Sequence, residues 1–296
     1  MKVKMKTKRR EKFTPLTTVM LAILLVYCIV MGILFLYAIV MSFKDPALYI
    51  YPTIWPDEKI YPHNYLKVLT ARPSFRAVGK VVNDTMGKII LNSVVYALGC
   101  GLVNTTVTCV TAYLCANYKY KYSRIVHTTV IVVMAIPIVG SQAAELSILR
   151  ALNLYNTWWG LLILKANFLG MYFLIFYEMF GSLPKTYREA AMLDGASDWR
   201  VMINIYFPLA KATFGTILLL NFINYWNDYQ TPILYAPSNP TLSRFLIEIT
   251  RTSQDDFDSM PVQLTTTVIL SIPTLALFLV FQKKLMSNLT IGGIKG

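Results

Sequence analysis

The sequence is poor in charge and in histidine. Only 15% of its 296 residues are charged, and its two histidines, His63 and His127, have no carboxylate or thiol partner near them in the chain. Neither H-E-x-x-H nor G-x-S-x-G occurs, which removes the sequence basis for a zinc peptidase or a serine hydrolase. We therefore assign no catalytic residue and no metal ligand.

Cysteine is scarce, and a nucleotide-binding loop is missing. The four cysteines lie in apolar runs at spacings that match no metal site or redox pair, which favours a role as small apolar filler. Gly79-Lys80 and Gly87-Lys88 lack the earlier glycine and the following Ser/Thr of the P-loop pattern G-x-x-x-x-G-K-[ST]. We expect no cofactor bound by this chain.

Hydrophobic residues are in excess, at 55%, and they form long runs. An apolar run of about 20 residues is long enough to cross a bilayer as a helix. The net charge of +13 then indicates basic loops on the inner side of a membrane rather than nucleic-acid binding. We predict an all-α membrane protein with six transmembrane helices, at about residues 16–42, 89–116, 125–138, 158–180, 209–234 and 262–281.

The segments between these runs predict the domain organisation. A basic N-tail (1–15) precedes the first helix (16–42), which is too long for a signal peptide and has no cleavage site after it. A loop with five prolines (43–88) should lie outside, followed by a core of five helices (89–285) and a C-tail (286–296). Both termini are predicted to be cytoplasmic, because 17 of the 28 basic residues fall in or beside the tails and the loops 119–124 and 183–208. The loop 43–88 holds seven basic residues against this trend, and the rule weakens in long loops.

The loop 183–208 is the longest polar, helix-coded stretch between two apolar blocks. Thr186 and Glu189 are spaced as a capping box, which predicts a helix that starts at Tyr187. Gly195 is placed to end this helix in a left-handed conformation.

A second helix should follow in the same loop. Ser197 can cap it, and Pro208 marks a break before the next span. Its apolar stripe would consist of Trp199, Met202, Ile203 and Tyr206. We expect a helix–glycine–helix elbow at the inner membrane surface. These residues alone fit a docking surface and a plain amphipathic hairpin equally well.

The same loop carries a longer pattern, E-A-A followed by a glycine and then by I-x-x-P, that resembles the EAA loop of bacterial ABC importer permeases. The matching residues are Glu189, Ala190, Ala191, Asp194, Gly195, Ala196, Ile205 and Pro208, with Phe207 where leucine is usual. Trp226-Asn227 with Pro232, and the tail LTIGGIKG, are similar to the carbohydrate class, in particular its smaller maltose-permease-like subunit. The resemblance covers essentially the whole chain and implies the type I ABC importer permease fold.

The resemblance implies a transport subunit of the bacterial inner membrane that moves a sugar or oligosaccharide from an extracytoplasmic binding protein into the cytoplasm. The implied partners are that binding protein, a second homologous permease, and two ABC ATPase subunits that hold ATP and Mg. The matching residues would dock the ATPase, and the C-tail residues Gly292, Gly293, Lys295 and Gly296 would reach it as well. Glu189 would either face a basic ATPase residue or cap its own helix, and the sequence leaves both roles open. The sequence also does not identify which sugar is transported.

Polar residues within the fifth span indicate a translocation path, because polar groups are costly in lipid and tend to face a cavity or another helix. Asn221, Asn224 and Asp228 fall on one predicted helical face, with Trp226 and Asn227 beside them. Amides next to aromatic rings suit a saccharide route, and packing against another helix or a partner permease explains them equally well. Lys165 is a weaker candidate, because its side chain could simply snorkel to the interface.

An ion-coupled secondary transporter is the alternative function. Such a carrier needs ionisable groups near mid-membrane and often has inverted repeats, whereas only Lys165 is deep here and no repeat is present. Two further segments are expected outside. One is a short amphipathic helix with Leu146, Leu149 and Leu152 on one stripe, and the other is the loop 237–261, which either touches a binding protein or is an ordinary solvated loop.

Overall fold

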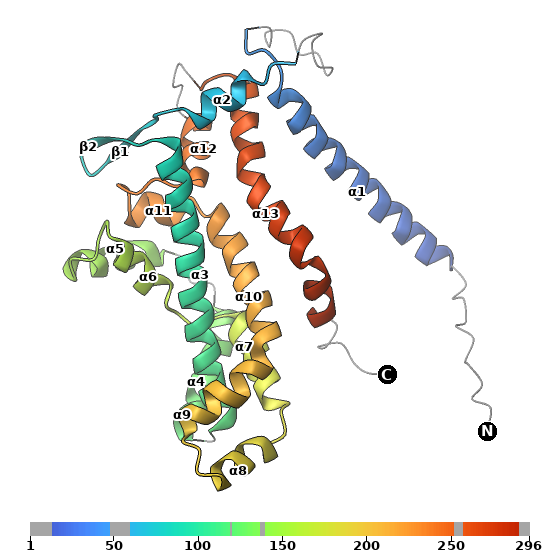
Figure 1. Cartoon of the computed structure of the whole chain (residues 1–296), viewed down its shortest axis with the longest axis vertical. Helices are drawn as coiled ribbons and strands as arrows, with labels where there is room; N and C mark the ends of the chain where they lie inside the picture. Colours follow the sequence, from blue (N-terminus) through green and yellow to red (C-terminus); the bar gives the residue numbers. More distant parts are fainter. Residues whose placement is uncertain (1–13, 48–59, 119, 137–139, 252–256, 290–296) are drawn as a thin grey trace.

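Long helices dominate the structure, a computed structural model that describes residues 14–47, 60–118, 120–136, 140–251 and 257–289 (Figure 1). The elements in chain order are α1 (Pro15–Ser42), α2 (His63–Leu69), β1 (Ser74–Ala77), β2 (Lys80–Asn83), α3 (Met86–Asn117), α4 (Lys121–Ala135), α5 (Ser141–Ala151), α6 (Trp158–Lys165), α7 (Met171–Gly181), α8 (Thr186–Leu193), α9 (Asp198–Val201), the π-helix η1 (Met202–Tyr206), α10 (Phe207–Asn227), α11 (Gln230–Tyr235), α12 (Leu242–Arg251) and α13 (Met260–Leu289).

Within the described residues, four helical stretches are long and apolar enough to cross a bilayer. They are Pro15–Ser42, Met86–Asn117, Asp198–Asn227 and Met260–Gln282. These stretches overlap four of the six predicted spans. The predicted span 125–138 corresponds to α4, which has 15 residues, and residues 137–139 lie outside the described part of the chain.

The predicted span 158–180 is not one helix, because α6 ends at Lys165 and α7 begins only at Met171. The interruption is stabilised by α3, where the amide of Asn104 donates hydrogen bonds to the carbonyls of Lys165 at 3.1 Å and Asn167 at 3.0 Å. Backbone that leaves helical geometry at membrane depth needs such internal partners. A polar side chain on a neighbouring helix therefore explains a break that the apolar run itself does not reveal.

The predicted span 209–234 is interrupted as well. α10 ends at Asn227, Asp228 adopts an extended conformation, and α11 resumes at Gln230. The prediction that Asp228 shares a helical face with Asn221 and Asn224 is therefore wrong. Asp228 lies beyond the end of α10, and its carboxylate accepts a hydrogen bond from the backbone N–H of Thr231 in the first turn of α11 at 3.1 Å.

α3 is the central helix and packs against α4, α6, α7, α10 and α12. Small residues permit this close packing: a Cβ at Gly101 would lie 3.6 Å from the backbone nitrogen of Phe222 in α10. Thr105 and Thr108 are also buried in α3. Small residues at these positions let the neighbouring helices approach α3 closely.

α1 differs from the other long helices, because it slants away from the bundle and meets α13 (Figure 1). Its apolar side chains are exposed from Leu16 to Tyr37, and burial begins at Met41 and Ser42. A helix this apolar and this exposed is suited to lipid contact or to a second subunit.

The end of the molecule opposite α8 is capped by α2, the β1–β2 hairpin and α12 (Figure 1). Arg244 of α12 is buried and donates hydrogen bonds to the Pro237 carbonyl at 2.6 Å and the Arg76 carbonyl at 3.2 Å, and its guanidinium binds Glu248 at 2.7 Å. The described part of the loop 237–261 is therefore folded onto the hairpin rather than an ordinary solvated loop. Of the predicted leucine stripe, Leu149 is buried, whereas Leu152 is exposed after the end of α5.

Candidate functional site

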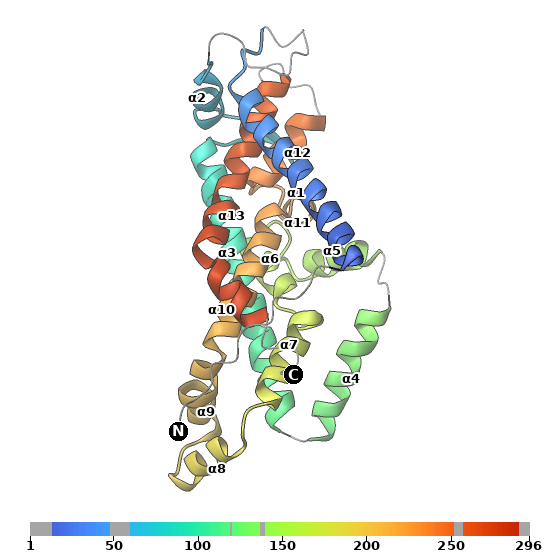
Figure 2. The ribbon, with the colours of Figure 1, turned by 90° about the vertical axis from the view of Figure 1, so that its right-hand side faces the viewer.

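α8 and α9 project at the end of the molecule opposite α2 and the hairpin (Figures 1 and 2). We call residues 183–208 the elbow. α8 has no buried residue, and Leu193 is 89% exposed although it is apolar. Tyr187, Met192 and Trp199 are also exposed. A projecting helix with exposed apolar side chains indicates a protein-binding surface.

The capping box predicted at Thr186 is wrong. α8 already includes Thr186, and the Glu189 backbone N–H donates to the Lys185 carbonyl at 3.1 Å instead of to a threonine oxygen. Pro184 explains the earlier start, because proline is favoured at the beginning of a helix and its carbonyl accepts from the Tyr187 N–H at 3.3 Å. Glu189 is exposed and takes no part in a cap, which leaves its carboxylate available to a partner.

The glycine turn of the elbow is confirmed. Gly195 has φ +78°, and its N–H donates to the Met192 carbonyl at 3.1 Å while the Ala196 N–H donates to the Ala191 carbonyl at 2.9 Å. These two bonds form a Schellman motif, which satisfies carbonyls at the end of α8. The predicted cap by Ser197 is also confirmed, since its hydroxyl oxygen accepts from the Arg200 N–H.

The residues of the E-A-A…G…I-x-x-P pattern divide into two groups. Glu189, Ala190, Asp194, Gly195 and Pro208 are exposed. The half-buried members Ala191, Ala196 and Ile205 pack against the buried core beneath the elbow. The pattern therefore combines positions that can touch a partner with positions that hold the elbow on the bundle.

The second arm of the elbow runs into α10 without a break. α9 is followed by the π-helix η1 and then directly by α10, whose first turn contains Pro208. The predicted break at Pro208 is therefore wrong. The predicted stripe is only half right: Met202 and Tyr206 are buried, but Trp199 and Ile203 are exposed, and Val201 is buried instead. The wider turn of a π-helix shifts the buried face relative to an α-helical stripe.

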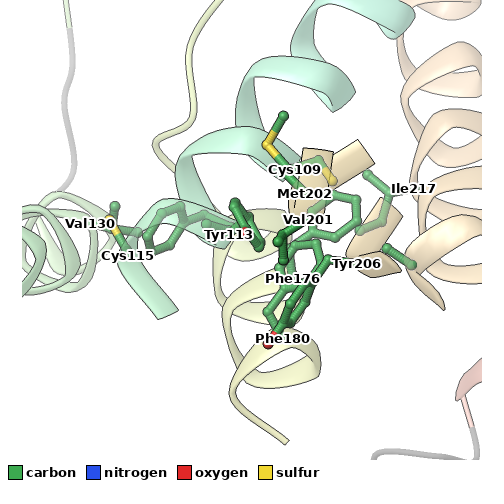
Figure 3. Packing of buried hydrophobic residues seen from close by; sticks show 13 residues of the cluster. Cys109, Tyr113, Cys115, Val130, Phe176, Phe180, Val201, Met202, Tyr206 and Ile217 are labelled. Carbon is green, nitrogen blue, oxygen red and sulfur yellow. The ribbon is translucent and has the colours of Figure 1, made fainter. Parts of the chain in front are cut away.

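An aromatic cluster anchors the elbow to the bundle (Figure 3). The ring of Tyr113 on α3 lies 5.1 Å from the ring of Tyr206 and 5.5 Å from the ring of Phe180, centre to centre. These edge-to-face contacts join α3, α7 and η1 in one buried cluster with Val201 and Met202. The elbow is therefore packed directly against α3 and α7.

Arg188 is a second connection between the elbow and α3. Its guanidinium donates to the Asn117 carbonyl at the end of α3 at 3.3 Å and to the Asp198 carboxylate of α9 at 3.1 Å. It also lies over the Tyr118 ring, 4.2 Å from its centre. Burial, and then the Asp198 carboxylate facing its hydroxyl, raise the pKa of Tyr118, so this phenol stays neutral at physiological pH.

A pocket of about 420 Å³ separates α8 from the end of α3. It is lined by Asn117, Tyr118, Tyr120, Lys185, Arg188, Glu189, Met192 and Tyr206. The pocket places the Glu189 carboxylate beside aromatic and basic side chains, so a side chain of a docked protein would meet both charge and ring surfaces here.

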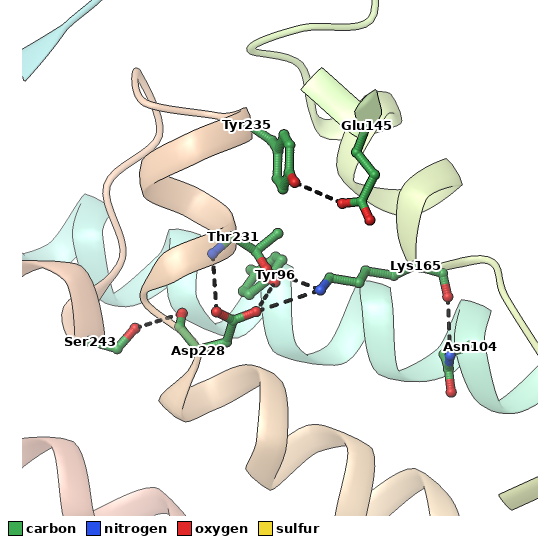
Figure 4. Close-up of polar contacts among 8 residues, drawn as sticks. All are labelled: Tyr96, Asn104, Glu145, Lys165, Asp228, Thr231, Tyr235 and Ser243. Carbon is green, nitrogen blue, oxygen red and sulfur yellow. Dashed lines mark hydrogen bonds and ion pairs between the residues drawn. The ribbon is translucent and has the colours of Figure 1, made fainter. Parts of the chain in front are cut away.

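A polar crossing lies further along the bundle, where both helix breaks meet (Figure 4). We define the polar crossing as Tyr96, Lys165, Asp228 and Thr231. The Lys165 ammonium lies 3.7 Å from the Asp228 carboxylate and donates to the Thr231 hydroxyl at 3.0 Å. The Tyr96 hydroxyl donates to Asp228 at 2.8 Å. The two charges are only 21% exposed, so each depends on these partners.

The pairing of Lys165 with Asp228 was not predicted from the sequence. Lys165 does not snorkel to an interface but binds Asp228 and Thr231, 63 and 66 positions later in the chain. The available signal was the position of Lys165 and Asp228 inside predicted spans, where a charge needs a partner of opposite sign. Arg188 was missed because its partners lie outside its own helix.

The other candidate path residues have different surroundings. Asn221 is buried and donates to Asn104 at 3.0 Å and to Thr105 at 2.9 Å, and Trp226 is buried with its indole N–H bonded to the Leu270 carbonyl at 2.9 Å. Asn224 and Asn227 are exposed, and Asn224 reaches the Tyr172 hydroxyl at 3.4 Å. The predicted C-tail residues Gly292, Gly293, Lys295 and Gly296 lie outside the described residues.

The sequence is similar to those of known transport proteins. Residues 108–288 match the family described as binding-protein-dependent transport system inner membrane component. The galactooligosaccharides transport system permease protein of Bacillus subtilis is 27% identical over 99% of both chains. The sulfoquinovosyl glycerol transport system permease protein of Agrobacterium fabrum is 26% identical over 86% of both.

A solved structure shares the fold. A chain in the crystal structure of a bacterial ABC transporter involved in the import of the acidic polysaccharide alginate aligns with a TM-score of 0.76 and 20% identity, covering 92% of this chain and 98% of that one. The family match begins near the end of α3 and runs to the last turn of α13, so it includes the elbow, Lys165, Asp228 and Thr231. The protein is therefore a multi-pass inner-membrane protein that belongs to the family of binding-protein-dependent transport system inner membrane components.

Proposed function

We propose that this chain is the permease subunit of an ATP-driven ABC importer, and that it moves a sugar or oligosaccharide from an extracytoplasmic binding protein into the cytoplasm. The observation that carries the proposal is the elbow. A helix without a buried residue, held by a Schellman turn and backed by an aromatic cluster, presents the exposed E-A-A…G positions to a partner. Such a surface suits a docking subunit that supplies the energy.

ATP and Mg are proposed to reside on that partner, a pair of ABC ATPase subunits. The chain carries no P-loop pattern of its own. Glu189, Ala190, Asp194, Gly195 and Pro208 would touch the ATPase, while Ala191, Ala196 and Ile205 would keep the elbow in place. The C-tail residues Gly292, Gly293, Lys295 and Gly296 stay a proposed second contact.

A second, homologous permease is the proposed partner within the membrane. The apolar face of α1 is exposed over most of its length, and the exposed side of α10 carries Asn224 and Asn227. We propose that these two amides and Asp228 line a path between the two permeases, and that the buried Asn221 and Trp226 support it from behind. Both termini and the elbow would then face the cytoplasm.

The proposed substrate class follows from the relatives. The two curated permeases above are named for galactooligosaccharides and sulfoquinovosyl glycerol, and a third, from Streptomyces coelicolor, is named as a diacetylchitobiose uptake system permease and is 23% identical over 92% of this chain. Amides beside aromatic rings, such as Asn224 beside Tyr172, suit the hydroxyls and faces of a saccharide.

Co-purification followed by vesicle transport tests the proposal. We expect the tagged chain to retain an ATPase dimer and a second permease, and the reconstituted complex to import sugar only with ATP and the loaded binding protein. Leu193→Asp at the elbow should abolish ATPase retention, whereas Val81→Asp, an equally non-conservative change at an exposed valine of the outer hairpin, should not. Uptake driven by a sodium or proton gradient without an ATPase would instead establish the secondary-transporter alternative.

A further inference from the structure

The two helices that flank the elbow are both interrupted at their far ends. α7 leads into the elbow and starts after the break at residues 166–170, and α10 leads out of it and stops at Asp228. Residues of α7, α9, η1 and α10 share one apolar cluster. Residues of α5, α6 and α11 contribute to a separate cluster around Leu149, Leu161 and Tyr235. The breaks therefore divide this part of the chain into an inner unit (α7 to α10) and an outer unit (α5, α6 and α11).

The polar crossing lies on the boundary between these units (Figure 4). Lys165 is the last residue of α6 in the outer unit, and Asp228 directly follows α10 of the inner unit. Their charged groups are 3.7 Å apart, and Thr231 of α11 contacts both of them. The ion pair thus links the end of one interrupted helix to the end of the other.

α3 passes both breaks without interruption and gives a polar side chain to each. Tyr96 donates to the Asp228 carboxylate at 2.8 Å. Asn104 donates to the carbonyls of Lys165 and Asn167, and it accepts from the Asn221 amide of α10 at 3.0 Å. A continuous helix beside two interrupted ones can act as a fixed axis, because hinges are positions at element ends that absorb backbone changes.

Stability alone does not explain the two charges. A largely buried ion pair contributes little net stability, because desolvation offsets the attraction between the charges, and apolar residues of similar size often hold two helices as well. A charged pair differs from an apolar contact in specificity. It favours the one arrangement of the two helix ends in which the charges meet, because separating them leaves two buried charges without partners.

We propose that the two breaks form a hinge through which movement of the elbow reaches the outer unit, and that Lys165 and Asp228 are the positioning residues that keep the two breaks in register. The inference rests on the import function proposed above. When the ATPase displaces the elbow, α7 and α10 move with it, because Phe180 of α7 packs against Tyr206 in the same buried cluster and η1 continues directly into α10. The ion pair then transmits this displacement to α6 and α11.

The test uses the full transporter, with both permeases, the ATPase and the binding protein. The double variant Lys165→Met/Asp228→Asn removes both charges together, so it leaves no unpaired charge in the membrane and keeps one side-chain oxygen that can accept from the Thr231 N–H. The matched control, Lys88→Met/Asp84→Asn, removes the ion pair that spans 2.6 Å at the outer start of α3. Assembly, sugar uptake, and the response of ATP hydrolysis to the loaded binding protein are measured for each.

We expect the double variant to assemble like the wild type, to import sugar about tenfold more slowly, and to lose the stimulation of ATP hydrolysis by the loaded binding protein. The control should import at the wild-type rate. Wild-type uptake by the double variant, an equal loss in the control, or failure of the double variant to assemble would each overturn the hinge. If the wild-type complex itself imports no sugar with ATP, the proposed function fails instead, so the two failures are distinguishable.

Discussion

The guanidinium of Arg188 lies over the ring of Tyr118, 4.2 Å from its centre, and this contact joins the exposed helix α8 to the end of α3. The same side chain bonds the Asn117 carbonyl and the Asp198 carboxylate. One arginine therefore connects both arms of the elbow to the central helix, although it belongs to the arm that has no buried residue.

Arg188→Met should loosen the elbow without unfolding the bundle. The change removes two hydrogen bonds and a cation–π contact, which together stabilise the docked α8 by about 1–2 kcal/mol. Hydrogen exchange of the α8 amides should therefore accelerate by roughly tenfold, while the α3 amides keep their protection.

Asp198→Asn provides the matched control. It removes the partly exposed ion pair at 3.1 Å but leaves the Asn117 and Tyr118 contacts of Arg188 in place. Its effect on α8 exchange should be much smaller, since exposed pairs contribute little. Equal acceleration in both variants would show that the ion pair, and not the connection to α3, holds the arm.

Gly195→Ala should destabilise the elbow by about 1–2 kcal/mol. The cause is the backbone, because Gly195 has φ +78° and a Cβ there would meet nothing within 4 Å. Gly181→Ala, at a glycine with equally open surroundings and no left-handed backbone, should be neutral or slightly stabilising. Retention of the ATPase on each tagged variant measures the difference; equal retention would contradict the role of the left-handed turn.

Gly160→Ala should be far more damaging than Gly101→Ala. A Cβ at Gly160 would overlap the Leu154 carbonyl oxygen, so the backbone must shift at a cost of about 1–3 kcal/mol. At Gly101 the nearest atoms are 3.6 Å away, which is ordinary contact. Thermal unfolding of the two purified variants in detergent compares them, and a lower transition temperature for Gly101→Ala would reverse the expected order.

The predicted orientation can be tested by labelling cysteines in intact cells. Val81→Cys on the outer hairpin should react with a membrane-impermeant maleimide, whereas Leu193→Cys on the elbow should react only after the membrane is opened. Both side chains are well exposed, at 64% and 89%, so access depends on the side of the membrane. The native Cys100, Cys109 and Cys115 are buried and should stay unlabelled. Labelling of Leu193→Cys in intact cells would place the elbow outside.

Local patterns predicted the parts of this site that depend on local geometry. Gly195 and Ser197 were recognisable because a left-handed turn and a helix cap are made by residues a few positions apart. Thr186 was misread for a similar local reason, since Pro184 starts the helix one residue earlier than the capping box requires. The prediction that Trp199 and Ile203 lie on the apolar stripe is wrong because α-helical spacing does not apply across the π-helix η1.

The sequence by itself determined the membrane character, the long apolar spans and the elbow, because hydropathy, chain length and the spacing of Glu189 to Pro208 are properties of neighbouring residues. Only the tertiary structure decided that two predicted spans are interrupted and that Lys165 meets Asp228. The breaks exist because Asn104 and Tyr96, on a different helix, supply hydrogen bonds to the freed backbone and to the Asp228 carboxylate. Such partners come together only when α3 packs between α6 and α10, and no periodicity within a single span encodes that contact.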